Sequence, residues 1–171
     1  DAVIWLRFFL DGKVSLHDMK FNRAINVNTN AATVYFYSRQ SNSKVFLEGA
    51  ILLRRTLTLY AAGSNYGVNT IVVSGKITED VAGAGALVVT GTEPTTSDPC
   101  MNHPFILTAA NTYSGGTSFN SASLAIGANN VLGTGPITFN GGCLVVAGPS
   151  AYRLRSVTNA VVLAAGGARF G

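Results

Sequence analysis

The acidic and histidine side chains are the residues of this chain that could catalyse a reaction. Of the eight acidic residues, only Glu79 and Asp80 are adjacent. Glycoside cleavage needs two carboxylates across one bond, and neighbouring strand residues face opposite sides, so this pair could not converge in a strand. In a loop, we expect both carboxylates to be solvated. His17 beside Asp18 has no accompanying nucleophile, zinc or phosphate motif, so we predict no catalytic residues and no enzymatic activity.

Cys100 and Cys143 are the two cysteines, and with His103 they could suggest a metal site. They fall short of the four clustered ligands of a structural zinc site, and two cysteines cannot make a disulfide framework. One disulfide could form in an oxidising compartment, whereas two separate buried thiols are the alternative. We therefore expect no metal and no cofactor, and the sequence leaves the disulfide open.

The composition predicts a folded chain whose surface is polar but largely uncharged. Of the 171 residues, 47% are hydrophobic, 12% are charged and 19 are glycine. Such a length suits one domain, and this balance is unlike that of a disordered chain.

The net charge of +4 comes from scattered basic residues, so we expect no binding to nucleic acid. No apolar stretch reaches the roughly 18 residues of a membrane-spanning helix, so we do not expect the chain to span a membrane.

Short segments rich in Val, Ile, Leu, Thr, Phe and Tyr alternate with turns rich in Gly, Asn and Ser. Helix signals are nearly absent, so the sequence predicts an all-β fold with almost no helix. The predicted strands are Val3–Leu10, Val14–Phe21, Ala24–Val27, Thr33–Tyr37, Val45–Leu53 with a bend at Gly49, Thr56–Tyr60, Asn69–Val73, Ala86–Thr90, Phe105–Thr108, Ser123–Ile126, Pro136–Phe139, Cys143–Val146 and Ala160–Leu163.

Several of these strands alternate apolar and polar residues, which predicts one buried face and one solvated face. In Thr56–Tyr60, for example, Leu57 and Leu59 should point inward. Tyr35 and Tyr37 share a face, where they could stack on sugars or pack against neighbouring strands. Periodicity alone is compatible with a sandwich, a barrel or a β-solenoid.

Residues 105–146 contain an ordered series of turn motifs between short strands. Ala-Asn-Thr-Tyr-Ser-Gly-Gly-Thr begins at Ala110, Asn-Asn-Val-Leu-Gly-Thr-Gly begins at Asn129, and Asn-Gly-Gly begins at Asn140. The glycine steps are expected to supply positive-φ corners for tight turns. This series resembles one copy of the autotransporter-associated β-strand repeat. The residues that carry the resemblance are Asn111, Tyr113, Gly115, Gly116, Gly127, Gly133, Gly135, Asn140, Gly141 and Gly142.

The resemblance implies that residues 1–171 form a single segment of a right-handed parallel β-helix, a β-solenoid that belongs to a longer chain. We expect roughly six to eight coils, stacked about 4.8 Å apart. The implied function is a non-catalytic structural or adhesive scaffold of a bacterial secreted or cell-surface, outer-membrane-associated protein. Its partners would be further β-helix repeats of the same or a neighbouring chain, surface glycans, or host or matrix proteins. The alternatives are a filament subunit that stacks through its coil ends, and a carbohydrate-binding or polysaccharide-cleaving β-helix.

Residues 91–104 depart from the repeat, because they form an insertion ahead of the signature. Three prolines in this stretch exclude a central strand, so the sequence predicts a protruding loop. Loops on a rigid scaffold often carry contacts, which makes Glu93, Asp98 and His103 the candidate contact residues. A passive insertion between coils is the alternative.

Overall fold

The computed structural model describes residues 2–8, 19–28, 30–38, 44–62, 70–91, 100, 105–147 and 154–171. Within these ranges the protein is all-β: every regular element is a strand, no helix is present, and every strand pair is parallel. None of the described residues therefore forms a helix that could cross a membrane. The expected all-β class is confirmed.

The strands belong to three separate sheets, here named A, B and C. Sheet A contains, in spatial order, β1 (Ala2–Phe8), β4 (Ala32–Ser38), β7 (Leu57–Ala62), β10 (Leu87–Gly91), β12 (Thr117–Asn120), β14 (Ile137–Asn140) and β16 (Val161–Leu163). Sheet B contains β2 (Met19–Phe21), β5 (Lys44–Leu47), β8 (Thr70–Val73), β11 (Phe105–Leu107), β13 (Ser123–Ile126), β15 (Cys143–Val146) and β17 (Arg169–Phe170). Sheet C contains β3 (Ile25–Val27), β6 (Ile51–Leu53) and β9 (Ile77–Glu79).

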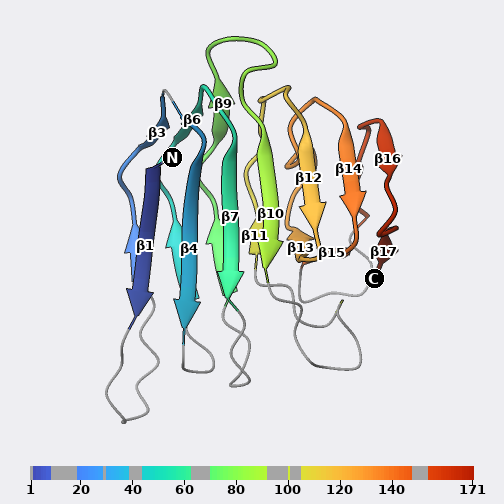
Figure 1. Ribbon diagram of the computed structural model, residues 1–171, viewed down its shortest axis with the longest axis horizontal. Helices are drawn as coiled ribbons and strands as arrows, with labels where there is room; N and C mark the ends of the chain where they lie inside the picture. Colours follow the sequence, from blue (N-terminus) through green and yellow to red (C-terminus); the bar gives the residue numbers. More distant parts are fainter. Residues whose placement is uncertain are drawn as a thin grey trace.

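From β1 to β9 the chain visits sheets A, B and C in turn, and from β10 to β17 it alternates between sheets A and B, advancing by one strand at each visit. β1, β2 and β3 lie in sheets A, B and C, and β4, β5 and β6 repeat that order beside them. Figure 1 shows the sheet A strands following one another along the longest dimension of the molecule, from β1 in blue to β16 in red. This arrangement is β-solenoid-like, because each new turn of chain is added parallel to the preceding one.

The core lies between the sheets and is built from aligned columns of side chains. In sheet A, alternate residues point inward, and parallel pairing places equivalent residues of successive strands side by side. One such column, the inner column of sheet A, contains Val34, Leu59, Val89, Phe119, Phe139 and Leu163. The first five are at most 2% exposed, and the Phe119 and Phe139 rings stack with centroids 4.7 Å apart. Burial of these columns supplies the main driving force for folding.

The structure also corrects several of the predicted strand boundaries. The predicted strand Val45–Leu53 is divided into β5 and β6 at the expected bend, where a Cβ on Gly49 would lie 2.0 Å from the Arg23 carbonyl oxygen. The sequence did not predict β9, β12 or β17. Within the predicted strand Val14–Phe21, the structure describes only β2, because residues 9–18 lie outside the described ranges.

Candidate interaction site at the exposed end of the sheets

The last strands of sheets A and B expose apolar residues that occupy inward positions. Val161 and Leu163 of β16 pair with Ile137 and Phe139 of β14, and Phe170 of β17 pairs with Leu144 of β15. Val161 is 50% exposed, Leu163 63% and Phe170 67%, although the three register partners are at most 8% exposed. We name the surface formed by Val161, Leu163 and Phe170 the open end face.

The open end face combines apolar side chains with two strand edges. β16 is the last strand of sheet A and β17 is the terminal strand of sheet B on the same side. An edge strand presents backbone N–H and C=O groups that can pair with a further parallel strand. Phe170 already contacts the core, with its ring centroid 5.5 Å from that of Phe139. This surface therefore has the chemistry required to accept further parallel strands.

Asn111 of the repeat signature joins three turns of chain at a buried corner. Its Oδ1 accepts a hydrogen bond from the Ile77 N–H at 2.8 Å, and its Nδ2 donates to the Val131 carbonyl at 2.5 Å. The side chain is only 3% exposed. Because a buried backbone group without a partner is costly, this amide satisfies groups that no strand satisfies at the corner. Its role is structural.

Tyr113 and Thr117 form a second buried polar contact near the same corner. The Tyr113 hydroxyl and Thr117 Oγ1 are 2.6 Å apart, and Thr117 Oγ1 donates to the Leu132 carbonyl at 2.9 Å. The Tyr113 hydroxyl is therefore the donor of the first bond. Burial raises the pKa of Tyr113 well above its usual value and outweighs the opposing effect of the Thr117 contact. This tyrosine stays neutral and packs in the core.

The Glu79 carboxylate is half-buried and hydrogen-bonded to protein groups, which corrects the prediction that it is simply solvated. It accepts hydrogen bonds from the N–H groups of Ser114 at 2.9 Å, Gly85 at 3.0 Å and Gly83 at 3.3 Å, and from the Ser114 hydroxyl. Burial of the carboxylate raises its pKa, but the hydrogen bonds from Ser114, Gly85 and Gly83 outweigh that effect, so the pKa of Glu79 is lowered. Glu79 therefore holds the local turn at Gly83 and Gly85 against Ser114, which lies in a later segment of the chain.

Asp80 also has a partner, on the other side of the strand end. Arg54 Nε lies 2.6 Å from Asp80 Oδ2, and Arg54 Nη1 donates to Asn28 Oδ1 at 2.7 Å. The ion pair is substantially exposed, so its contribution to stability is small. Glu79 and Asp80 thus bind different partners and do not converge on a shared site.

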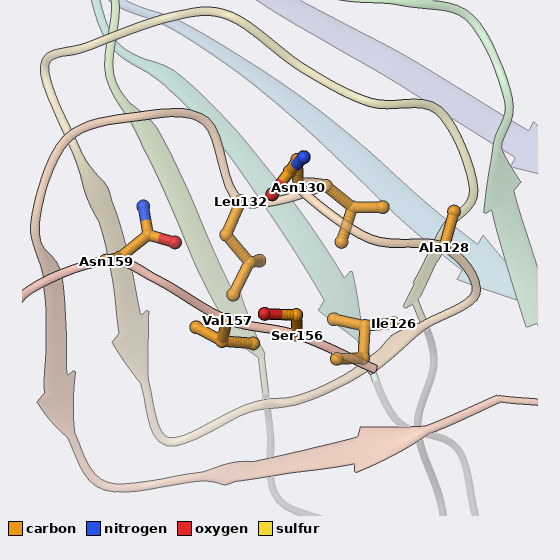
Figure 2. A pocket seen from close by; sticks show the side chains of 8 residues that line it. Ile126, Ala128, Asn130, Leu132, Ser156, Val157 and Asn159 are labelled. Atoms are coloured by element: carbon orange, nitrogen blue, oxygen red, sulfur yellow. The ribbon is translucent and has the colours of Figure 1, made fainter. Parts of the chain in front are cut away.

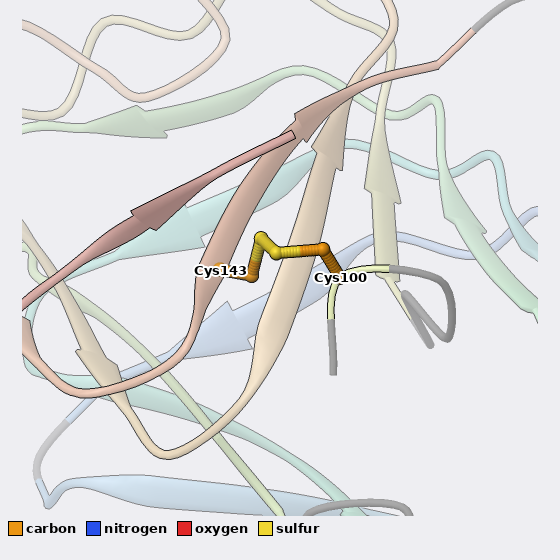
Figure 3. The surroundings of a disulfide bond; sticks show 2 residues. All are labelled: Cys100 and Cys143. Atoms are coloured by element: carbon orange, nitrogen blue, oxygen red, sulfur yellow. A yellow bond between two sulfur atoms is a disulfide. The ribbon is translucent and has the colours of Figure 1, made fainter. Parts of the chain in front are cut away.

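Cys100 and Cys143 form a disulfide, with Cα atoms 5.4 Å apart (Figure 3). Of the two alternatives that the sequence allowed, the disulfide is the one present, and the alternative of two separate buried thiols is wrong. Cys143 is fully buried and packs with Ala125 and Val145 in an apolar cluster that is separate from the main core. Alternate residues of β15 face opposite sides, so this cluster lies on the outer face of sheet B. The disulfide holds Cys100, a residue of the insertion, against that face.

The signature glycines act in two different ways. Four of them have positive φ, for example Gly116 at 94° and Gly142 at 91°, as the predicted corners require. Gly115, Gly127 and Gly135 do not, which corrects the prediction for these three. They are required by close approach instead: a Cβ on Gly135 would lie 2.2 Å from the Ser114 carbonyl oxygen. The remaining signature residue, Asn140, donates to Asn120 Oδ1 at 3.0 Å.

Metal-ligating side chains do not cluster among the described residues. No group of three or more His, Cys, Asp or Glu residues in these ranges could hold a metal. Figure 2 shows a hollow lined by Ile126, Leu132, Val157 and Asn159, among others, which is too tight to admit a ligand. The candidate contact residues Glu93, Asp98 and His103, together with His17 and Asp18, lie outside the described residues.

Comparison of the chain with protein-family models, with curated proteins and with solved structures gave no match.

Proposed function

We propose that this chain is a structural scaffold without catalytic activity, in which further parallel coils stack on the open end face. The main support is that Val161, Leu163 and Phe170 are in register with buried core residues, yet their own side chains are at least half exposed. Exposed apolar surface bordered by edge strands marks an interaction surface. The stacked coil belongs to the same or to a neighbouring chain, and the second case produces a filament or larger assembly.

The proposed architecture is a right-handed parallel β-helix with one strand of sheet A in each coil. The repeated order of sheets A, B and C from β1 to β9, and of sheets A and B from β10 to β17, supports it, as does the strong preference of parallel connections for right-handed crossing. On this proposal each of the seven described strands of sheet A belongs to a different coil. The resemblance of residues 105–146 to the autotransporter-associated β-strand repeat supports the same architecture.

The proposed location is the exterior of a bacterium, either secreted or at the cell surface. Disulfides persist in oxidising compartments and are rare in the reducing cytosol, so the Cys100–Cys143 bond favours export. The resemblance supports a passenger-like role in an outer-membrane-associated protein, with adhesion as the corresponding activity.

Sedimentation velocity over a wide range of protein concentrations tests the stacking proposal. We expect the chain to associate head to tail, because parallel pairing at the open end face requires the added strands to run in the same direction. Leu163→Lys places a charge on the open end face and should abolish association. Leu154→Lys is the matched control, since Leu154 is 95% exposed and lies outside the strands. A chain that stays monomeric throughout would contradict stacking between neighbouring chains, and equal effects of the two variants would contradict its location on the open end face.

A further inference from the structure

The outer face of sheet A carries two continuous columns of uncharged side chains. Parallel register aligns Thr33, Thr58, Val88, Ser118 and Thr138 in the first column. The second column contains Tyr35, Tyr60, Thr90, Asn120 and Asn140. The residue that precedes each of them in its strand is buried, so these residues point outward. Nine are half-buried and Asn140 is exposed.

The second column changes from aromatic to amide side chains along the molecule. The Tyr35 and Tyr60 rings have centroids 5.0 Å apart and are tilted by 48°. At the other end, Asn140 donates one hydrogen bond to Asn120 at 3.0 Å. Each amide has two donors and a carbonyl with two lone pairs, so this single bond leaves most of their capacity for a ligand. In β1, Trp5 takes the register position next to Tyr35.

We propose that this outer face of sheet A binds an extended, neutral polysaccharide that lies along the second column. Pyranose rings present apolar C–H faces that stack on aromatic rings, and hydroxyl groups that hydrogen-bond to amides and to other hydroxyls. The column spans five strands, or about 19 Å between its end residues at about 4.8 Å per step. A linear row of contacts of this length suits several consecutive sugars of one chain.

Charge and polarity favour a neutral polysaccharide over other polymers. Neither column contains a charged residue, whereas nucleic acids and acidic polysaccharides are recognised by clustered Lys and Arg. The core of a protein–protein interface is more apolar than these rows of Thr, Ser and Asn. The outer face of sheet B differs in this respect, because its equivalent column includes Phe46, Val72 and Ile106. This inference does not depend on stacking at the open end face.

Affinity electrophoresis of the whole chain in gels that contain a single polysaccharide provides the test. The probes are a β-glucan, a mannan, a xylan and a galactan, with alginate as the anionic comparison. We expect retardation by at least one neutral polymer that added salt does not weaken. Failure of all four neutral polymers, or retardation by alginate alone that salt abolishes, would overturn the proposal.

Matched variants locate the bound chain. Tyr60→Thr gives β7 the residue that β10 has at this position, and it should weaken binding about tenfold. Asn140→Ala changes an exposed side chain without disturbing the core and should weaken binding about threefold. Phe46→Thr removes an aromatic ring from the outer face of sheet B and should leave binding unchanged. Equal losses of binding in Tyr60→Thr and Phe46→Thr would overturn the assignment to sheet A. Leu163→Lys should bind the polysaccharide as the unmodified chain does, because binding does not require stacking at the open end face.

Discussion

The interior strands β14 and β15 and the end strands β16 and β17 place similar residues in the same columns, yet their burial is opposite. Ile137 and Phe139 are fully buried, whereas Val161 and Leu163, which pair with them, are 50% and 63% exposed. The difference does not arise from residue type, since all four are apolar. It arises because, among the described strands, β14 has a paired strand on both sides, whereas β16 has one on only one side. Burial at these positions therefore depends on whether a further strand lies alongside.

The largest test of this comparison places the same substitution at both kinds of position within the inner column of sheet A. Leu59→Ala should lower the free energy of unfolding by about 2–5 kcal/mol, because it leaves a cavity in a packed column. Leu163→Ala should change it by less than about 1 kcal/mol in the monomer, because that side chain is mostly exposed. Urea denaturation measures both values. Equal losses would show that the end strands are as well packed as the interior.

A second test breaks the disulfide that holds Cys100 against the interior strand β15. Cys143 is fully buried, whereas its register partner in β17, Arg169, is exposed. Reduction of the Cys100–Cys143 bond should lower the free energy of unfolding by about 2–4 kcal/mol. Urea denaturation with and without a reductant gives the difference, and the double variant Cys100→Ser with Cys143→Ser controls for other effects of the reductant. Stability that does not respond to reduction would show that the bond is absent or without effect.

A third test compares two asparagines that bridge turns of chain. Asn111→Ala leaves the buried Ile77 N–H and Val131 carbonyl without their partner and should cost about 1–3 kcal/mol. Asn159 lies nearer the open end and donates to the Gly133 and Gly135 carbonyls. Its replacement by alanine should cost about 0.5–1 kcal/mol, because water can reach that half-buried site. The comparison fails if Asn159→Ala is the more destabilising variant in thermal unfolding.

The smallest expected effect is a pH dependence at the Glu79 corner. The pKa of Glu79 is lowered below its ordinary value of 4.5, so the unfolded state takes up the proton first as pH falls. The stabilisation is present above the unfolded pKa and is lost as pH falls through the folded pKa. Residues 154–171 contain no acidic residue, so the end strands cannot contribute to this loss.

Urea midpoints measured as a function of pH test this assignment. Glu79→Gln should flatten the acid limb of the profile. Glu48→Gln is the control, because the Lys20–Glu48 ion pair is exposed and should contribute little. An acid limb that Glu79→Gln leaves unchanged would assign the loss to another carboxylate.

Alternation of apolar and polar residues was sufficient to predict most strands of the fold, including the inward positions of Leu57 and Leu59. It failed for β12, whose Thr, Ser and Asn read as a turn. Thr117 is buried there because Tyr113 and the Leu132 carbonyl complete its hydrogen bonds. These partners come from the turns before and after the strand, and a local pattern does not contain them.

The candidate sites were less predictable, because they depend on contacts between turns of chain. The sequence around Glu79 does not reveal that Ser114, 35 residues away, donates to its carboxylate. The disulfide likewise depends on how the insertion carries Cys100 to β15. The exposure of the open end face could not be predicted, because the apolar residues Val161–Leu163 have the pattern of a buried strand. Only the register of β16 shows that these side chains are a continuation of the core.

Amide hydrogen exchange of β16 and β17 at low and high protein concentration tests coil stacking most directly. We predict that the amides of these two strands become protected as concentration rises, while those of the interior strands β12–β15 are protected at every concentration. The Leu163→Lys variant should lose the concentration-dependent protection. Protection that never appears in β16 and β17, or that appears only on sheet A strands away from the open end face, would contradict the account.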